Sequence, residues 1–446
     1  MADKSRTPKT FFVLTYGCQM NQRDSETIGG ILLSRGMTEA PDLASADLVM
    51  VNTCTVRDKA EQKVYGLLGR FRQLKEEKPD LVLGICGCMP QQQDVARHIK
   101  ARYPFMDLII GTHNLNTLGT YLDQVLQERQ QVLALWDERA LDELDLPARR
   151  SGGHKAFVNI NWGCNNFCTY CIVPYVRGRE KSRPPEAISA EVKSLAAEGY
   201  KEITLLGQNV NSYGKDLPGR PDFVSLLYRL SALPGIERIR FMTSHPRDAG
   251  DRLVQAFAEL PKLCRHLHLP LQAGSDPILA KMNRGYTTQH YLAIVDRFRQ
   301  GVPDLALTTD LIVGFPGETE EDFLATLALV RQVRFDSAFT FMYSPRQGTP
   351  AATMPGRLEG AVLKERLQRL IILQNKISLE LNQELLGRVL PVLVEEGAEG
   401  KYKGRTATNK LVFFPSAIDR RGQIVAVKIT QAKTWSLSGE VEAEKQ

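Results

Sequence analysis

Three cysteines within one short stretch are the feature of this chain that points most directly to chemistry. They are Cys164, Cys168 and Cys171, in the run Gly-Cys-Asn-Asn-Phe-Cys-Thr-Tyr-Cys. Cysteine thiolates hold iron–sulfur clusters, and a cubane cluster has four irons to ligate. Three thiolates leave the fourth iron open, and an open position on a metal centre is where a substrate or cofactor binds. We interpret this run as the site of a [4Fe-4S] cluster with one open iron.

A zinc site or a redox dithiol is the alternative interpretation of the same cysteines. Structural zinc usually takes four ligands, commonly from two paired motifs. No fourth Cys and no Cys/His pair follows Cys171 at the usual spacing. The spacing therefore favours a cluster.

A second set of cysteines lies in the first 125 residues, where strand-like and helix-like segments alternate. Cys18, Cys54 and Cys88 follow the first three of the four strand-like runs, which are residues 10–16, 48–53, 81–85 and 108–110. Helical segments at residues 58–78 and 91–102 lie between them, so we predict an open parallel α/β sheet. Parallel strands end at the same edge, where such sheets bind ligands. The three thiols should therefore converge and form a second three-thiolate site.

Three separate buried core cysteines are the alternative, because free Cys is often fully buried. Each of the three lies just beyond an apolar run, where a core residue is least expected, and Cys18 and Cys88 each follow a glycine. Cys86 competes with Cys88 as the third ligand. Since Cys86 ends the strand-like run, we interpret it as a packing residue and Cys88 as the ligand.

Residues from about 154 to 350 contain six further strand candidates separated by helical stretches such as 185–198 and 221–233. The strand candidates are residues 156–161, 202–206, 238–242, 266–269, 306–313 and 338–343. The first of them leads into the Cys164 run. A charged segment, residues 137–150, precedes this region and ends in Pro147-Ala-Arg-Arg-Ser-Gly-Gly, which is typical of a domain boundary.

The C-x-x-x-C-x-x-C spacing, with Tyr170 before the last cysteine, resembles the signature of the radical S-adenosylmethionine (SAM) enzymes. The resemblance implies that SAM chelates the open iron, that Tyr170 lies near its adenine, and that the six units form a partial (β/α)6 barrel. Barrel active sites lie at the carboxyl ends of the strands. Polar or glycine-rich loops follow four strands there, at 207–211, 244–246, 272–275 and 314–318. By position, the expected SAM contacts are Gln208, Asn209, Asp310 and Glu318, although Asp310 could equally end a strand as a cap.

The C-terminal part carries a concentration of positive charge. Residues 358–386 read as one long helix, followed by short strands at 389–394, 411–414 and 424–429 that suggest a small β-barrel. Between Lys401 and Lys433 eight Lys and Arg side chains face one acid, Asp419, whereas the whole chain has a net charge of only +6. We expect this module to bind a polyanion, most simply nucleic acid, through Lys403, Arg405 and Lys410. Arg177 and Arg179 are further candidate RNA contacts, and a solvated charged loop is the alternative interpretation.

Length and composition fit a multidomain protein of the cytoplasm. The chain has 446 residues, no apolar run of the length a membrane span needs, and no hydrophobic signal core at its start. Eight unevenly spaced cysteines do not resemble a disulfide scaffold, and clusters and free thiols fit a reducing compartment. We expect a cytoplasmic protein without a membrane partner.

These features together resemble the radical SAM methylthiotransferases over nearly the whole chain. The matching motifs are Gly17-Cys18-Gln-Met-Asn21 with Asp24-Ser-Glu26, Asn52-Thr-Cys54-Thr-Val-Arg57, Gly87-Cys88, and Gly163 to Arg179. The resemblance implies an auxiliary-cluster domain over residues 8–128, a radical SAM core over 150–380 and a TRAM RNA-binding domain over 383–446. Residues 206–213 and 267–276 are similar to the MiaB-type branch, which acts on N6-isopentenyladenosine in tRNA.

The resemblance also implies a mechanism with two [4Fe-4S] clusters. The cluster on Cys164, Cys168 and Cys171 would cleave SAM to a radical that removes hydrogen from carbon 2 of the adenine. That carbon is unactivated, so the cofactor supplies the difficult step. The cluster on Cys18, Cys54 and Cys88 would hold the sulfur that a second SAM methylates. The implied partners are tRNA carrying N6-isopentenyladenosine beside the anticodon, an electron donor and a sulfur source, and we expect a monomer.

Other functions share part of this pattern. Related branches modify threonylcarbamoyl-adenosine in tRNA or an aspartate of a ribosomal protein, and the basic module favours RNA over a protein side chain. An iron–sulfur carrier without a substrate would need no barrel with four polar loops at one edge. We therefore expect a tRNA methylthiotransferase.

Overall fold

The computed structural model describes residues 8–55, 58–135, 148–150 and 152–442. The chain divides into two compact units. The N-terminal unit comprises Met1–Gly152 with Trp162–Asn165 and Ile172–Arg179, and the C-terminal unit comprises Gly153–Asn161, Asn166–Cys171 and Glu180–Gln446. Cys164 therefore belongs to one unit, and Cys168 and Cys171 to the other. The expected linker at residues 137–150 lies largely outside the described residues.

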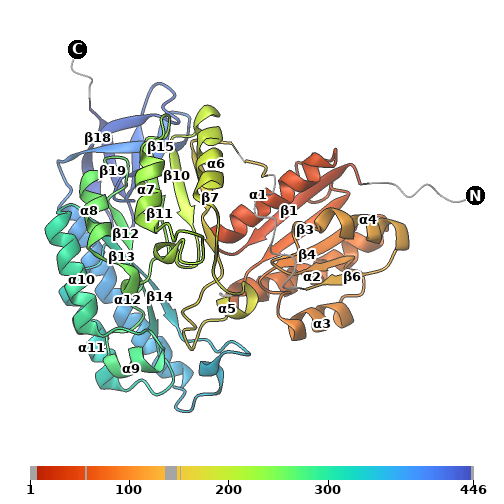
Figure 1. Cartoon of the computed structure of the whole chain (residues 1–446), viewed down its shortest axis with the longest axis horizontal. Coiled ribbons are helices and arrows are strands. Elements are labelled where there is room, and N and C mark those ends of the chain that lie inside the picture. Colours follow the sequence, from red (N-terminus) through yellow and green to blue (C-terminus); the bar gives the residue numbers. More distant parts are fainter. Residues whose placement is uncertain (1–7, 56–57, 136–147, 151, 443–446) are drawn as a thin grey trace, which may run out of the picture. The chain divides into compact units, whose positions relative to one another are not determined.

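The N-terminal unit is built on six parallel strands in the order β2-β1-β3-β4-β5-β6 (Figure 1). This confirms the open parallel sheet. Its strands are β1 (Thr10–Tyr16), β2 (Thr38–Glu39), β3 (Leu48–Thr53), β4 (Val82–Gly87), β5 (Leu108–Ile110) and β6 (Val132–Ala134). Its helices are α1 (Gln19–Ser34), α2 (Asp58–Glu77), α3 (Gln93–Arg102), α4 (Leu118–Glu128) and the short α5 (Val173–Val176).

The strands of this sheet carry apolar side chains on both faces, which explains why helices cover both faces. Met50 packs with side chains of α1 and α4, whereas its neighbours Val49 and Val51 pack with side chains of α2 and α3. Successive side chains of a strand point to opposite faces, so an apolar run such as Leu48–Val51 serves both cores. The carboxyl edge of the sheet is left for the loops that carry cysteines.

Six parallel strands of the C-terminal unit follow one another in sequence order. One sheet has the order β11-β10-β7 and the other β12-β13-β14, and a parallel bridge between Ile239 and Leu263 joins them. The strands are β7 (Lys155–Asn159), β10 (Glu202–Leu206), β11 (Arg238–Phe241), β12 (His266–His268), β13 (Ala306–Val313) and β14 (Ser337–Met342). All six lie within two residues of the predicted ranges, and the arrangement is the expected partial barrel. Two short strands, β8 (Asn161–Trp162) and β9 (Lys181–Ser182), pair separately.

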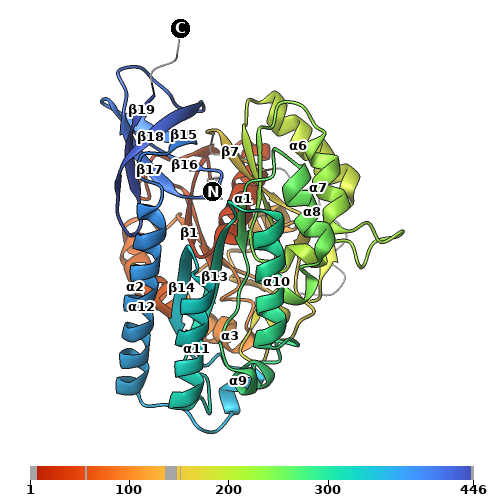
Figure 2. The ribbon, with the colours of Figure 1, turned by 90° about the vertical axis from the view of Figure 1, so that its left-hand side faces the viewer.

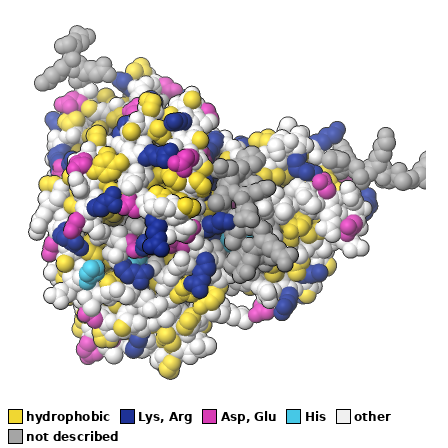
Figure 3. Space-filling model, in the orientation of Figure 1, with side chains coloured by type: hydrophobic (Ala, Val, Ile, Leu, Met, Phe, Trp, Pro, Cys, Tyr) yellow, Lys and Arg dark blue, Asp and Glu magenta, His cyan; other side chains and the backbone are white. Residues whose placement is uncertain are grey.

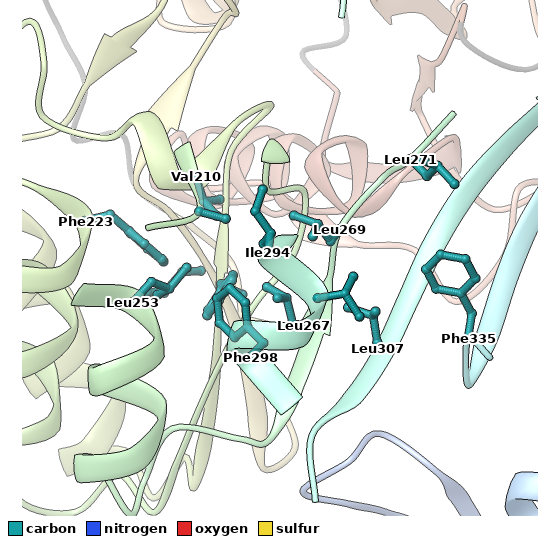
Figure 4. Packing of buried hydrophobic residues seen from close by; sticks show 14 of the residues in the cluster. Val210, Phe223, Leu253, Leu267, Leu269, Leu271, Ile294, Phe298, Leu307 and Phe335 are labelled. Carbon is teal, nitrogen blue, oxygen red and sulfur yellow. The ribbon is translucent and has the colours of Figure 1, made fainter. Parts of the chain in front are cut away.

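Helices cover the outside of this partial barrel. Figure 2 shows α10, α11 and α12 running alongside β13 and β14. The helices are α6 (Pro185–Ala197), α7 (Phe223–Ser231), α8 (Asp251–Glu259), α9 (Asp276–Lys281), α10 (Thr288–Gly301), α11 (Glu320–Val333) and α12 (Gly360–Gln383), with 3-10 turns η2 (Val210–Ser212), η3 (Pro246–Asp248) and η4 (Pro350–Thr353). The core lies between strands and helices, where Leu267 and Leu307 face Phe298 (Figure 4).

A closed five-stranded barrel completes the C-terminal unit. Its order is β15-β16-β17-β19-β18, formed by β15 (Val389–Ala398), β16 (Lys401–Thr406), β17 (Leu411–Pro415), β18 (Ile424–Ala432) and β19 (Leu437–Val441). This confirms the small β-barrel expected after the long helix. Buried guanidinium groups tie it to the larger barrel. Arg238 donates to the carbonyls of Pro391 (2.8 Å) and Arg405 (2.7 Å), and Arg240 donates to those of Thr406 (2.5 Å) and Ala407 (3.1 Å).

Candidate functional site

Cys18, Cys54 and Cys88 lie at one edge of the N-terminal sheet, as the sequence predicts. Each follows one of three neighbouring strands, β1, β3 and β4, whose registers run side by side to Thr53 and Gly87. The Cys18 and Cys54 side chains are hydrogen-bonded to each other, and the charges of Cys18 and Cys88 influence one another. The fold therefore brings together three thiols that are far apart in sequence.

An asparagine pair and two glycines hold the loops that carry these thiols. Asn21 Oδ1 accepts from the backbone N–H of Cys18 (3.3 Å), and Asn21 Nδ2 donates to Asn52 Oδ1 (3.1 Å). A Cβ at Gly17 would collide with Asn21 Oδ1 and lie 2.8 Å from Cys54 Cβ. Gly87 has a φ of +101°, and a Cβ there would meet the carbonyl of Thr53. The glycines before Cys18 and Cys88 thus permit a close approach that no other residue allows.

The three thiols differ in their electrostatic environment. A hydrogen bond from Cys54 lowers the pKa of Cys18 to about 6, although partial desolvation of this surface-exposed thiol opposes the shift, and the charge of Arg177 adds to the lowering. Burial raises the pKa of Cys88, although Arg177 opposes this. A thiolate is the metal-binding form of cysteine. Arg177 therefore stabilises the form of both cysteines that an iron would need.

Cys86 occupies a different environment from Cys88. It is fully buried on the face of the sheet that packs against α1 and α4, and burial raises its pKa strongly. Cys88 instead packs with Ile172 and Val176, at the carboxyl edge. This placement supports Cys88 over Cys86 as the third ligand.

The segment of Cys164, Cys168 and Cys171 is held by backbone hydrogen bonds at several points. Cys164 N donates to the Gly178 carbonyl (3.2 Å) within the N-terminal unit. In the C-terminal unit, Thr169 N donates to the Met282 carbonyl (3.1 Å) and Cys171 N to the Cys168 carbonyl (2.9 Å). Phe167 adopts a φ of +47°, a left-handed conformation that is unusual for a bulky residue. The stretch from Phe167 to Cys171 is thus a tight turn.

Arg284 is a candidate functional residue that sequence reasoning missed. Its guanidinium is buried and donates to Cys168 Sγ (3.2 Å) and to the hydroxyl of Tyr170 (3.4 Å). It also donates to the Pro270 carbonyl (3.0 Å) and the Tyr286 hydroxyl (3.0 Å). The sequence separation between Arg284 and Cys168 is 116 residues, so no local pattern could have indicated the contact.

Buried polar atoms without partners collect after β7, β10 and β11. Asn159 Oδ1, Asn161 Oδ1, Gln208 Oε1, Asn209 Oδ1 and His245 Nε2 have no hydrogen-bond partner among the described residues. His245 Nδ1 accepts from the Arg247 N–H (3.2 Å), which leaves Nε2 to carry the proton. Unpaired buried polar atoms are costly unless a ligand satisfies them. Four acceptors and one donor at the carboxyl ends of barrel strands fit a polar cofactor such as SAM.

The expected SAM contacts have varied surroundings. Tyr170 packs against the core and accepts from Arg284, and Asn209 is held by Asp248 (3.0 Å). Asp310 lies 3.5 Å from His268 Nε2 and is partly exposed. Glu318 is buried in an ion pair with Arg366 of α12 (2.6 Å) and accepts from the Gly314 N–H. The structure therefore supports Gln208 and Asn209 by their unsatisfied atoms and gives Glu318 a partner within the protein.

The expected RNA-binding cations also divide into two groups. Arg177 is buried against Asp24 (2.6 Å), and Lys410 pairs with Asp336 (2.6 Å), with both side chains mostly covered. Arg179 is exposed, and Lys403 and Arg405 are on the outward face of β16 beside Glu396 (2.8 Å) and Glu395 (3.6 Å). Basic and acidic side chains are interspersed on the face in Figure 3.

The donor sets fit iron–sulfur clusters better than single metal ions. Within the described ranges, no three His, Cys, Asp or Glu side chains are arranged to hold one metal ion. A cubane cluster binds each thiolate to its own iron, so its ligands stand further apart than those of one ion. The two cysteines outside these sets, Cys86 and Cys264, are both buried. Three thiolates would leave one iron of a cubane cluster open.

Three family models match the chain in succession. The model of the "Uncharacterized protein family UPF0004" matches residues 10–111, that of the "Radical SAM superfamily" matches residues 158–330, and that of the "TRAM domain" matches residues 383–441. The fold and the cysteine motif thus define a radical SAM enzyme. This superfamily implies a [4Fe-4S] cluster and SAM.

Relatives extend the match to the whole chain. A tRNA-2-methylthio-N(6)-dimethylallyladenosine synthase of Carboxydothermus hydrogenoformans is 52% identical over 97% of this chain and 99% of the relative. Proteins of the same name from Desulforamulus reducens and Caldicellulosiruptor saccharolyticus are 52% and 49% identical, over 99% and 98% of this chain and 97% and 93% of theirs. The chain belongs to the family of these radical SAM methylthiotransferases.

Solved structures share the fold at low sequence identity. The radical SAM methyltransferase TsrM from Kitasatospora setae superposes with a TM-score of 0.58 at 14% identity, covering 89% of this chain and 80% of the other. The cobalamin-dependent radical SAM enzyme OxsB gives a TM-score of 0.52 at 11% identity, covering 83% of this chain and 56% of the other.

In the part of the chain that the structure describes, no helix is long and apolar enough to cross a membrane.

Proposed function

We propose that this enzyme adds a methylthio group to carbon 2 of N6-isopentenyladenosine, next to the anticodon of tRNA, giving 2-methylthio-N6-isopentenyladenosine. The observation that carries the proposal is the presence of two cysteine triads in one chain of this family. We call Cys164, Cys168 and Cys171 the motif triad, and Cys18, Cys54 and Cys88 the auxiliary triad. One three-thiolate site serves SAM cleavage, and the other serves the sulfur that is transferred.

The motif triad would hold the cluster that binds SAM. When bound, the cluster and SAM together supply the one-electron chemistry that removes hydrogen from an unactivated carbon. Arg284 fixes Cys168 and Tyr170. Asn161, Gln208, Asn209 and His245 offer unsatisfied polar atoms that would orient a polar cofactor at the barrel edge.

The auxiliary triad would hold a second [4Fe-4S] cluster. The low pKa of Cys18 and the close loop packing around Gly17 and Gly87 support this. Its open iron would hold the sulfur that accepts a methyl group from a second SAM. An electron donor and a sulfur source complete the reaction, which we place in the cytoplasm with a monomeric enzyme.

The C-terminal barrel would bind the tRNA backbone. Lys403 and Arg405, with Lys401, lie on the outward face of β16, and Arg179 is exposed in the N-terminal unit. Phosphate contacts from such cations supply affinity and orientation. Arg177 and Lys410 are largely buried, whereas Arg179 is exposed and Lys403 and Arg405 are partly exposed, so the proposal for RNA rests on these three. The anticodon loop is unpaired, which suits an enzyme that must take one base into a pocket.

Mass spectrometry of tRNA nucleosides tests the proposal. A strain without the gene should contain N6-isopentenyladenosine but not its methylthio derivative, and the wild-type gene should restore the derivative. Genes carrying Cys164→Ala or Cys88→Ala should not restore it. Loss of methylthio-threonylcarbamoyl-adenosine instead, or of a modified ribosomal aspartate, would assign the enzyme to another branch of the family.

A further inference from the structure

Each triad has one cysteine whose sulfur accepts a hydrogen bond from a buried arginine. Arg177 Nε donates to Cys88 Sγ at 3.2 Å, and Arg284 Nη1 donates to Cys168 Sγ at 3.2 Å. Both arginines are 5% exposed. Arginine is rarely buried without a partner that accounts for its charge. The two contacts lie in different units, so each arginine serves its own triad.

Arg177 is fixed by a carboxylate as well as by sulfur. Its Nη2 donates to Asp24 Oδ2 at 2.6 Å, and Asp24 lies on α1, which begins directly after Cys18. Thr112 Oγ1 donates to the Val176 carbonyl at 2.6 Å and anchors the chain beside Arg177. Asp24 balances the charge of Arg177, so the net positive charge beside the auxiliary triad is small.

Arg284 is held by neutral acceptors. Its partners, besides Cys168, are the Pro270 carbonyl and the hydroxyls of Tyr170 and Tyr286, and no carboxylate forms an ion pair with it within the described residues. A buried charge without a counter-charge is strongly unfavourable. A cluster ligated by three thiolates is anionic and would supply that counter-charge.

We propose that Arg177 and Arg284 are positioning residues that tune the two clusters separately, each raising the reduction potential of the cluster on its own triad. For Arg177 the inference rests on the proposed auxiliary cluster. Hydrogen bonds to cluster sulfurs and local positive charge both favour the more negative, reduced state. Because Asp24 neutralises Arg177 and no carboxylate neutralises Arg284, Arg284 has the larger effect.

Potentiometric titration followed by electron paramagnetic resonance tests this on full-length, anaerobically reconstituted protein. A background with Cys164, Cys168 and Cys171 changed to Ala isolates the auxiliary cluster, and one with Cys18, Cys54 and Cys88 changed to Ala isolates the motif cluster. Arg284→Gln should lower the midpoint potential of the motif cluster by about 59 mV or more, a tenfold change in a one-electron equilibrium. Arg177→Gln should lower that of the auxiliary cluster by a smaller amount.

Each substitution is the matched control for the other. Arg177→Gln should leave the motif cluster unshifted, and Arg284→Gln should leave the auxiliary cluster unshifted. Unchanged potentials in both backgrounds, or equal shifts of both clusters by either substitution, would overturn the inference. If the background that lacks the motif triad holds no iron with both arginines intact, the auxiliary cluster of the proposed function fails instead.

Lysine variants keep the test decisive where a glutamine variant loses its iron. Arg177→Lys and Arg284→Lys keep the charge but not the planar fork of donors. The inference predicts that the lysine variant keeps its iron. Its cluster should have a midpoint potential nearer to the wild-type value than that of a glutamine variant that still binds iron, which would support a role of charge at the cluster. Loss of iron from both variants with an unchanged melting temperature would show that the arginine is needed to hold the cluster whatever its charge, and would contradict the tuning of its potential. Loss of iron together with a lowered melting temperature in both variants would show a structural role only and would contradict the inference.

Discussion

Cys86 and Cys88 are two residues apart, yet their surroundings assign them different roles. Cys86 lies at the end of β4 and packs into the core between the sheet and α1 and α4. Cys88 lies beyond the strand, beside Arg177 and near Cys18. Side chains two residues apart in a strand point to the same face, so it is the left-handed turn at Gly87, with a φ of +101°, that takes Cys88 away from the face of Cys86. A small shift along the chain therefore separates a packing residue from a candidate ligand.

Cys88→Ala should reduce the iron content of reconstituted protein from about eight to about four irons per chain, because each cubane cluster has four. Cys86→Ala is the matched control and should keep about eight. Removing its buried sulfur leaves a small cavity, so Cys86→Ala should instead lower the melting temperature. Iron analysis and thermal unfolding measure both effects. Half-loss of iron from the Cys86 variant, with none from the Cys88 variant, would reverse the assignment.

His245 provides a prediction about pH. Burial, followed by the positive charges of Arg284 and Arg247, lowers the pKa of His245 from 6.5 to about 2. Between these values the unfolded chain binds a proton that the folded protein does not. The stability contributed by this neutral histidine is present above pH 6.5 and is lost as the pH falls. As the pH falls through this range, one such group lowers the free energy of unfolding by up to about 1.4 kcal/mol for each pH unit.

Urea denaturation of the wild type and His245→Asn at several values between pH 6.5 and 5 measures this contribution. The variant has no imidazole to protonate, so its stability should fall less steeply with decreasing pH. The difference in slope should approach that of one proton. Parallel slopes for the two proteins would show that His245 is already protonated when folded.

The strand β16 carries its cations on one face, because successive side chains of a strand point in opposite directions. Tyr402, Gly404 and Thr406 point into the barrel, and Lys401, Lys403 and Arg405 point outward. Lys403 is the cross-strand partner of Phe413 on β17, and Phe413 is 42% exposed. An exposed aromatic ring beside cations is a common platform for unpaired bases. The outward faces of β16 and β17 are therefore the best candidate for the RNA-binding surface of this barrel.

Lys403→Gln and Phe413→Ala should weaken tRNA binding in different ways. Loss of one phosphate contact should reduce the slope of log affinity against log salt by about 1. Loss of one stacking ring should cost about 1–3 kcal/mol while leaving the slope unchanged. Lys410→Gln is the control: its ammonium pairs with Asp336, so it should lower stability without changing the slope. Equal slopes for the Lys403 variant and the wild type would remove β16 from the interface.

At the scale of the whole molecule, the C-terminal barrel is joined to the larger barrel by a buried charge cluster. Glu202 pairs with Arg240 Nε (3.0 Å) and lies 3.9 Å from Arg238, and both arginines donate to carbonyls of the small barrel. Asn382 adds bonds to the carbonyls of Lys433 and Thr434. Removing the small barrel would leave these guanidinium groups without their acceptors. Point variants are therefore better tests of RNA binding than truncation.

Glu202→Gln should destabilise the folded protein by about 3–5 kcal/mol, because it leaves two buried guanidinium groups without their carboxylate. Glu237→Gln is the matched control. Glu237 pairs with Lys201 at the surface, and such pairs contribute about 1 kcal/mol or less. Chemical denaturation of the full-length protein measures both. A loss of stability no greater for the Glu202 variant than for the Glu237 variant would contradict the joining role of the cluster.

Local sequence patterns were enough to locate most of the elements and both triads. The apolar runs predicted both ends of β1, β3, β5, β10 and β13 as the structure has them. Buried strands can be predicted in this way because their apolar residues follow one another in the sequence. The rule that parallel strands end at one edge then brought Cys18, Cys54 and Cys88 together. The short spacing of the motif triad needed no fold at all. The strands β2 and β6 and the helix α4 were not singled out.

The partners of several charged side chains became visible only in the folded structure. Arg177 sits in a basic run that predicted RNA contacts, but it is buried against Asp24 and Cys88, and Arg284 reaches Cys168 across 116 residues. Lys410 and Glu318 likewise have ion-pair partners from distant segments. The physical reason is that a long charged side chain pairs with whichever group the fold brings near it. Such a group can be far away in sequence, so a local sequence pattern does not indicate it.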